Sequence, residues 1–136
     1  MNTRLRASVL FYVAALYDGV LGLAFLLAPG RVFAHFGILP PNHVGYVHFP
    51  AALLLVFTVM LLAIARNPHE NRGLIPYCIL LKVAYCGVVF GHWFTAGIPA
   101  MWKPFAIADV LFAALFVWAY RALRRRSAGA SSWRPM

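Results

Sequence analysis

Residues 8–28 read SVLFYVAALYDGVLGLAFLLA, an almost unbroken apolar stretch with a single charged residue, Asp18, near its middle. A bilayer hydrocarbon core of about 30 Å takes about 20 helical residues to cross, and this stretch supplies them. Lipid offers no partners for unpaired backbone groups, so such a segment crosses the bilayer as a helix. The stretch therefore predicts a membrane-spanning helix.

Three further apolar stretches follow, over residues 46–65, 74–95 and 104–120. Residues that favour helix ends separate them, as at Pro29-Gly30 and Asn67-Pro68. The whole chain of 136 residues is 63% hydrophobic and 11% charged, whereas soluble domains carry about 25% charged residues. We therefore predict an all-α polytopic membrane protein, a four-transmembrane-helix bundle whose membrane domain covers residues 8–120.

Basic residues outside the predicted spans gather on one side of the membrane. The other side carries only Arg31 and Lys103. The richer side carries Arg4, Arg6, Arg66, Arg72, Arg121, Arg124, Arg125, Arg126 and Arg134. Basic loops stay in the cytoplasm, which predicts that both termini are cytoplasmic, with residues 1–7 as a short segment and 121–136 as a basic, disordered tail. Because no basic face is interleaved with polar readout residues, nucleic-acid binding is not expected.

The longest connection, residues 29–44, mixes apolar and polar residues. Two interpretations fit this composition. One is a short amphipathic helix lying on the outer membrane surface. The other is a loop folded over the mouth of the bundle.

Three charged residues fall inside the predicted spans: Asp18, Lys82 and Asp109. Each costs about 2.5–3.5 kcal/mol on insertion scales, so such residues face a partner, a cavity or a function. At 1.5 Å per helical residue, Asp18 and Lys82 differ in depth by about 5 Å, which two side chains can span. They form either a functional pair or a structural ion pair. Asp109, about 8 Å below the outer surface, either caps or hydrates its helix, or pairs with Lys103 or His92.

These positions predict a polar pocket, either a ligand-binding site or a buried polar network. It opens outward through His48, His92 and Asp109 and ends near Asp18 and Lys82. Two tyrosines border it, Tyr17 and Tyr85. Two His and a carboxylate are a known metal ligand set, but nothing in their spacing requires a metal, and we predict none.

Gly87 and Gly91 form a GxxxG pattern in the third span. This pattern lets two helices approach closely. The contact is either the seam of a homodimer or close packing within one chain.

Residues 16–38, LYDGVLGLAFLLAPGRVFAHFGI, resemble the first helix and turn of DoxX-like small membrane proteins. The four-span layout and the length are similar as well. The resemblance implies a four-helix membrane bundle in the inner membrane of a bacterium. Some such proteins are similar to subunits of quinone-linked oxidoreductases, which implies a quinone cofactor and a membrane redox partner. No catalytic residue carries over to this sequence.

Three functions fit these observations. The first is a small ligand-binding or accessory membrane subunit whose ligand is a quinone or lipid-like molecule. The second is a proton or small-solute transporter acting as an oligomer. The third is a purely structural partner of a membrane complex. The sequence shows no nucleophile–base pair, HExxH, phosphate loop or CxxC motif, so enzymatic activity is not expected of this chain alone.

Overall fold

The computed structural model describes residues 1–130, which contain helices and turns and no strands. Four helices are long and apolar enough to cross a membrane. They are α1 (Thr3–Leu27), α3 (Gly45–Arg66), α4 (Ile75–Trp93) and α5 (Trp102–Ala130). The connections carry a short helix, α2 (Pro29–Phe36), and a 3-10 turn, η1 (Arg72–Leu74). The prediction of an all-α four-helix membrane bundle is confirmed, and the chain is a multi-pass membrane protein.

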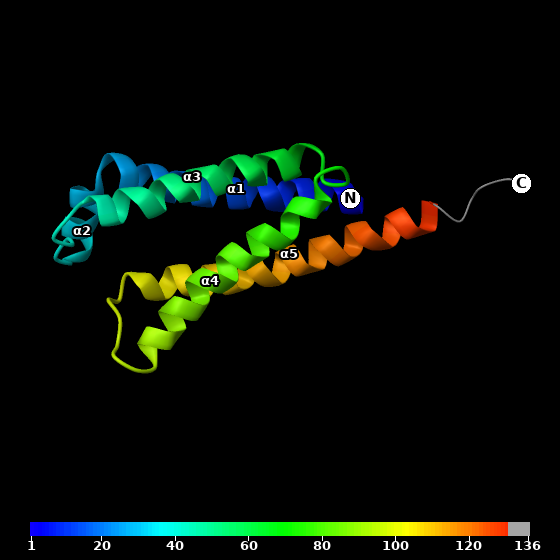
Figure 1. Cartoon of the computed structure of the whole chain (residues 1–136). Coiled ribbons are helices and arrows are strands. Elements are labelled where there is room, and N and C mark those ends of the chain that lie inside the picture. The colour runs from blue at the N-terminus through cyan, green and yellow to red at the C-terminus, as the bar shows by residue number, and fades with distance from the viewer. Residues whose placement is uncertain (131–136) are drawn as a thin grey trace, which may run out of the picture.

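The four long helices form two antiparallel pairs, α1 with α3 and α4 with α5 (Figure 1). The start of α1, the α3–α4 connection and the end of α5 lie at one end of the bundle, here called the terminal end. Helix α2 and the α4–α5 connection lie at the opposite end, here called the loop end. Helix α4 crosses α5 and diverges from it towards the loop end (Figure 1).

Helices α1 and α3 approach each other closely because α1 presents glycines to α3. A Cβ atom added at Gly22 would lie 2.9 Å from Leu55 Cδ2 and 3.1 Å from the Ala51 carbonyl oxygen. One added at Gly19 would lie 3.1 Å from Thr58 Cγ2. Without hydrophobic driving force in lipid, helices associate through such tight packing of small residues.

The apolar core lies in the half of the bundle at the terminal end. Its centre is the stack of Phe11 on Phe116, with ring centroids 4.8 Å apart. Small and branched residues from all four long helices surround this stack: Ala7, Ala14, Ala15, Leu61, Ile64, Ala65, Ile75, Cys78, Ala119 and Leu123. The Ser8 hydroxyl donates to the Ala65 carbonyl at 2.7 Å, so this polar group is satisfied inside the core.

Two helices extend beyond the predicted spans. Helix α1 begins at Thr3, because Asn2 caps it by accepting the Leu5 N–H at 2.8 Å. Helix α5 continues to Ala130. The prediction that 121–136 is a disordered tail is therefore wrong for 121–130, where alanine, leucine and arginine favour the helix and no proline interrupts it. Residues 131–136 lie outside the described part of the chain.

The connection at 29–44 contains a helix over its first half. Pro29 starts α2 at a position that needs no N–H, and Gly37, at a φ of 65°, ends it in the left-handed conformation. The Phe33 ring packs edge-on against Phe25 of α1, with centroids 6.0 Å apart. Of the two interpretations of this connection, the structure shows the short helix, folded back against α1.

Candidate functional site

The three charged residues of the membrane spans meet in one cluster, formed by Asp18 on α1, Lys82 on α4 and Asp109 on α5. Each lies on the inward face of its helix, beside small or apolar residues, and their exposed fractions are 1%, 1% and 7%. The cluster thus joins three helices at one buried point. Since the apolar core occupies the terminal end, the cluster lies on the loop-end side of that core.

Lys82 is shared between the two carboxylates. Its Nζ donates to Asp18 Oδ1 at 2.6 Å and lies 3.0 Å from Asp109 Oδ1. The contact with Asp109 is an ion pair without hydrogen-bond geometry, because Asp109 Oδ1 accepts no hydrogen bond. With all three groups ionised, the cluster carries one negative charge in excess, which is costly in a low-dielectric interior.

Three buried polar atoms in and beside this cluster have no hydrogen-bond partner within residues 1–130. They are Asp18 Oδ2, Asp109 Oδ1 and the Tyr17 hydroxyl. Buried polar groups are nearly always paired, since leaving one unpaired costs about 1–3 kcal/mol. These two acceptors and one hydroxyl have hydrogen-bonding capacity that the described residues leave unused, although Asp109 Oδ1 is ion-paired with Lys82.

Aromatic rings enclose the lysine head. Lys82 Nζ lies 5.5 Å from the centroid of the Tyr17 ring and 5.6 Å from that of Phe112, within reach of cation–π attraction. Tyr17 itself packs against Phe112 at 5.3 Å and against Phe105 at 6.5 Å. The site therefore combines charged groups with flat apolar walls, which is typical of sites for small amphipathic molecules.

Tyr85 and Cys86, on the next turn of α4, continue this face towards the loop end. The Tyr85 ring is half-buried and lies 6.5 Å from the ring of Trp102 at the start of α5. The Cys86 thiol donates weakly to the Ala106 carbonyl at 3.5 Å. Tyr85 thus borders the site region without a hydrogen bond to the charged cluster among the described residues.

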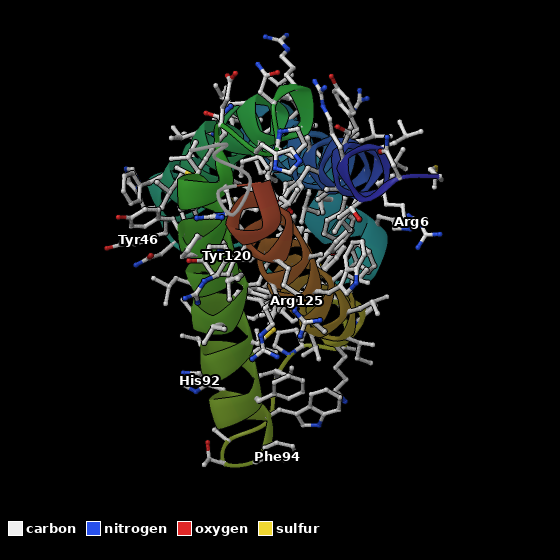
Figure 2. The ribbon with its side chains drawn as sticks, turned by 90° about the vertical axis from the view of Figure 1, so that its right-hand side faces the viewer. Arg6, Tyr46, His92, Phe94, Tyr120 and Arg125 are labelled. Carbon is white, nitrogen blue, oxygen red and sulfur yellow. The ribbon has the colours of Figure 1, made fainter. Side chains whose placement is uncertain are left out.

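The two histidines expected at the pocket mouth do not join the cluster. His48 is half-buried on α3, and His92 lies exposed on the outer side of α4 (Figure 2). His92 follows Lys82 by ten residues, which turns it about 80° away around the helix, and α4 diverges there from α5. Within residues 1–130, no group of three His, Cys, Asp or Glu side chains is placed to hold a metal.

Asp109 has a different partner from those the sequence suggested. It contacts Lys82, whereas Lys103 lies over the ring of Trp93, with Nζ 4.9 Å from the centroid. A signal in the sequence was available: Lys82 is the single basic residue within the spans, and Asp18 and Asp109 are the two acidic ones. With two carboxylates and one ammonium inside the membrane, contact of the ammonium with both carboxylates is favoured, because the alternative leaves one carboxylate without a partner.

The GxxxG glycines face away from the rest of the chain. A Cβ atom added at Gly87 or at Gly91 would meet no heavy atom within 4 Å. Of the two alternatives for this pattern, close packing within one chain is therefore not what the structure shows. The other alternative, a homodimer seam, stays a prediction.

No family model, curated protein or solved structure matches this chain. The likeness of residues 16–38 to DoxX-like proteins stays a prediction, and the function rests on the geometry of the site.

Proposed function

We propose that this protein is a small ligand-binding or accessory membrane subunit, and that its ligand is an amphipathic molecule with a hydrogen-bonding polar head, such as a quinol. The observation that carries the proposal is the set of unpaired polar atoms around Lys82. Asp18 Oδ2 has no donor, Asp109 Oδ1 has only the ion-paired Lys82 ammonium 3.0 Å away, and Tyr17 offers an unpaired hydroxyl. The hydroxyl groups of a quinol supply donors that complete these bonds.

The surroundings of the cluster support a flat, apolar ring system in the ligand. The rings of Tyr17 and Phe112 lie beside the charged groups, and Phe105 packs against Tyr17. Offset stacking on such rings adds about 0.5–1.5 kcal/mol beyond simple burial. If a quinone-type group is bound, it supplies the redox chemistry, and this chain's residues orient its oxygen atoms and hold a proton on a carboxylate.

Access to the site favours a ligand over a through-path. Between the cluster and the terminal end lies the apolar core around Phe11 and Phe116. Of the three charged side chains, Asp109 is the most exposed, at 10%, compared with 2% and 1% for Lys82 and Asp18. These facts support entry of the ligand from the Asp109 side. Among the described residues, the apolar core leaves no polar path for a proton or solute from the cluster to the terminal end, so we prefer ligand binding to transport.

Removing the Tyr17 hydroxyl tests the ligand site with little disturbance of the fold. We expect Tyr17→Phe to weaken binding of decylubiquinol by about two- to tenfold, since a hydrogen bond between neutral groups contributes about 0.5–1.5 kcal/mol. Binding is measured by titrating the purified full chain in detergent and following quenching of tryptophan fluorescence. Asp109→Asn should weaken binding as well, because an amide is a poorer acceptor for the quinol hydroxyl.

The matched control is Tyr77→Phe, which removes the same atom from an exposed tyrosine on α4. This variant should bind the quinol as the wild type does. Equal binding by the Tyr17 and Tyr77 variants, or the absence of saturable binding by the wild type, would refute the proposed ligand. If Asp109→Asn then changed stability alone, the cluster would be a purely structural element of a membrane complex.

We also propose that the terminal end faces the cytoplasm and that the protein resides in the inner membrane of a bacterium. The orientation is supported by the excess of arginine at that end, set against Arg31 and Lys103 at the loop end. The inner-membrane location follows only from the likeness of residues 16–38 to DoxX-like proteins. Cysteines introduced at Arg6 and Arg31, in a chain with both natural cysteines replaced by alanine, should label differently. A membrane-impermeant maleimide added to intact cells should reach position 31 and not position 6, and the reverse pattern would overturn this orientation.

Two partners fit the proposed role. A second copy would pack on α4 through Gly87 and Gly91, where added Cβ atoms meet nothing in the chain itself. A membrane redox partner would exchange the quinol with the site. The second copy is proposed from these open glycines, and the redox partner from the ligand-binding role.

A further inference from the structure

A second site lies on α5 near the terminal end, away from the charged cluster. It is a groove of about 310 Å³ whose lining side chains all belong to α5. They follow the spacing i, i+3, i+4, i+7, i+8 and i+11, which places them on one face of the helix. The lining residues are Ala114, Val117, Trp118, Arg121, Ala122 and Arg125.

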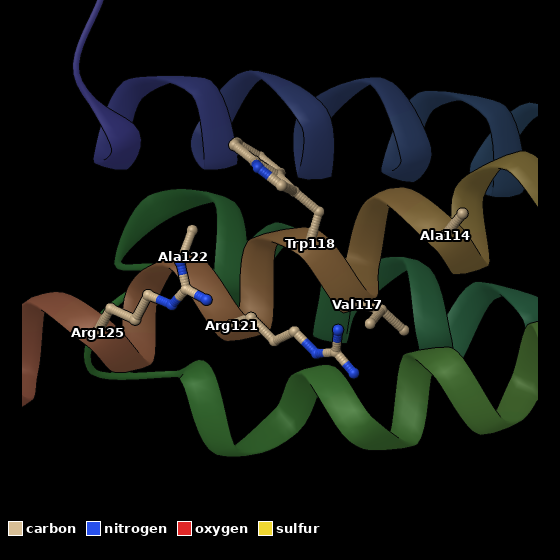
Figure 3. Close-up of a pocket in the computed structure, with 6 residues that line it drawn as sticks. All are labelled: Ala114, Val117, Trp118, Arg121, Ala122 and Arg125. Carbon is tan, nitrogen blue, oxygen red and sulfur yellow. The ribbon is translucent and has the colours of Figure 1, made fainter.

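The groove changes character along the helix. Ala114 and Val117 line the end of the groove nearer the middle of α5 and make it apolar. Arg121 and Arg125 bring two guanidinium groups to the end nearer the terminal end of the bundle. Trp118 lies between these parts and extends towards the α1 side of α5 (Figure 3). Tryptophan favours the level of the lipid headgroups, where one part of the ring is apolar and its N–H is hydrated.

The position along the helix agrees with this level. Arg121 follows Trp102, the first residue of α5, by 19 residues, which corresponds to about 28 Å of helix. The hydrocarbon core is about 30 Å thick. A helix that starts at one interface therefore brings Arg121 and Arg125 to the opposite headgroup layer, with Ala114 and Val117 beside the acyl chains.

The positive charge of the groove has no counterpart in the described protein. The full chain contains three acidic residues, and two of them, Asp18 and Asp109, share Lys82. The third, Glu70, lines a different surface cavity, with Arg4. Within residues 1–130, neither Arg121 nor Arg125 forms an ion pair, so both guanidinium groups are available to an anion from outside the chain.

We propose that this groove binds one anionic phospholipid. The phosphodiester lies between Arg121 and Arg125, which offer the planar donor pairs that match phosphate oxygens. One acyl chain follows the apolar strip past Ala114 and Val117. Basic sites at helix surfaces next to the membrane interface bind acidic headgroups in this manner.

The chemistry of the groove favours a lipid over other occupants. Inorganic phosphate would use the arginines and gain nothing from the apolar strip. A second copy of this chain would place its own basic groove or other arginines against these two, in a protein of net charge +9. A phospholipid satisfies both parts at once, and its binding does not depend on the quinol site.

Counting bound lipid on the purified full chain tests the proposal. Native mass spectrometry in detergent micelles would follow titration with dioleoyl phosphatidylglycerol and, separately, with dioleoyl phosphatidylcholine. The wild type should prefer the anionic lipid. Arg121→Gln with Arg125→Gln should weaken binding of phosphatidylglycerol by about 30-fold, since each of the two basic residues near the surface contributes about fivefold.

The matched control is Arg6→Gln with Arg124→Gln, which removes the same charge from exposed arginines that do not line the groove. This control should bind nearly as the wild type does. Equal losses in the two double variants, or equal binding of both lipids by the wild type, would overturn the site. Displacement of the lipid by millimolar inorganic phosphate would assign the groove to a free anion and also overturn it.

A second variant keeps the test decisive if the arginine variant fails to fold. Ala114 is exposed, so Ala114→Phe fills the apolar strip while leaving both arginines in place. It should reduce phosphatidylglycerol binding severalfold without changing the far-ultraviolet circular dichroism spectrum. Unchanged binding by this variant would show that the acyl chain does not use the groove.

Discussion

Replacing Lys82 by methionine will lower the free energy of unfolding by about 3–5 kcal/mol, the usual cost of removing one partner from a buried ion pair. The side chain has a similar length and is apolar, so the change removes the ammonium group and little volume. It leaves Asp18 and Asp109 buried together at 1% and 7% exposure with no cation between them. Titration with sodium dodecyl sulfate in mixed micelles, followed by circular dichroism, measures the loss.

Two control variants separate charge from packing. Asp109→Asn leaves Asp18 and Lys82 as a balanced pair at 2.6 Å, so its loss should be clearly smaller than that of Lys82→Met. A variant in which Lys82→Met is combined with Asp18→Asn and Asp109→Asn has no buried charge and should recover most of the stability. A Lys82→Met protein as stable as the wild type would mean that water or lipid headgroups reach the two carboxylates.

Enlarging Gly22 will separate α1 from α3. We expect Gly22→Leu to lower the free energy of unfolding by about 1–3 kcal/mol, as overpacking of a tight contact does. The first added atom alone would lie 2.9 Å from Leu55 Cδ2 and 3.1 Å from a backbone oxygen, that of Ala51. The Leu55 side chain can rotate, but the backbone oxygen moves only with its helix. The same detergent titration measures this effect.

Gly87→Leu is the matched control for that prediction. It makes the same substitution on α4, where an added Cβ atom meets nothing within 4 Å. The monomer should tolerate it, with a small gain from the better helix propensity of leucine. Equal losses at Gly22 and Gly87 in the monomeric protein would contradict the packing described here. A loss at Gly87 that appears only when the protein is dimeric would indicate that this face is covered by a second copy.

Both predictions concern the same part of the molecule. The glycine contact holds α1 on α3, and the charged cluster joins α1 to α4 and α5, the second helix pair. Asp18 and Gly22 lie one helical turn apart on α1, so a shift of this helix displaces the carboxylate as well. Gly22→Leu should therefore also weaken quinol binding if the cluster is the ligand site.

The sequence predicted correctly those features that the surrounding hydrocarbon alone determines. Hydrocarbon selects long apolar helices, so the four spans and the all-α class follow from composition. At the helical repeat, Asp18 shares a face with Ala14, Ala15 and Gly22, and all four residues are buried. Depth arithmetic brought Asp18 and Lys82 to the same level of the membrane, and the structure places them in contact.

The sequence was less informative about helix directions and helix ends. The depth of Asp109 suggested partners near the outer surface, but the long Lys82 side chain reaches it from another helix. His92, expected at the mouth of the pocket that ends at Lys82, points in another direction, because ten residues are not a whole number of helical turns. The arginine-rich tail read as disordered, although high helix propensity continues α5 through Ala130.

By itself, the sequence determined that this chain forms four apolar helices suited to a membrane. Hydrocarbon favours long apolar helices whatever their neighbours are, so composition alone is enough. Only the tertiary structure decided which carboxylates share Lys82, which glycines are packed and which face outward, and which arginines line a groove. These choices depend on how helices cross and rotate against one another. The crossing angles and rotations of the helices are set by short-range contacts between side chains of different helices. The sequence of one span alone does not show these contacts.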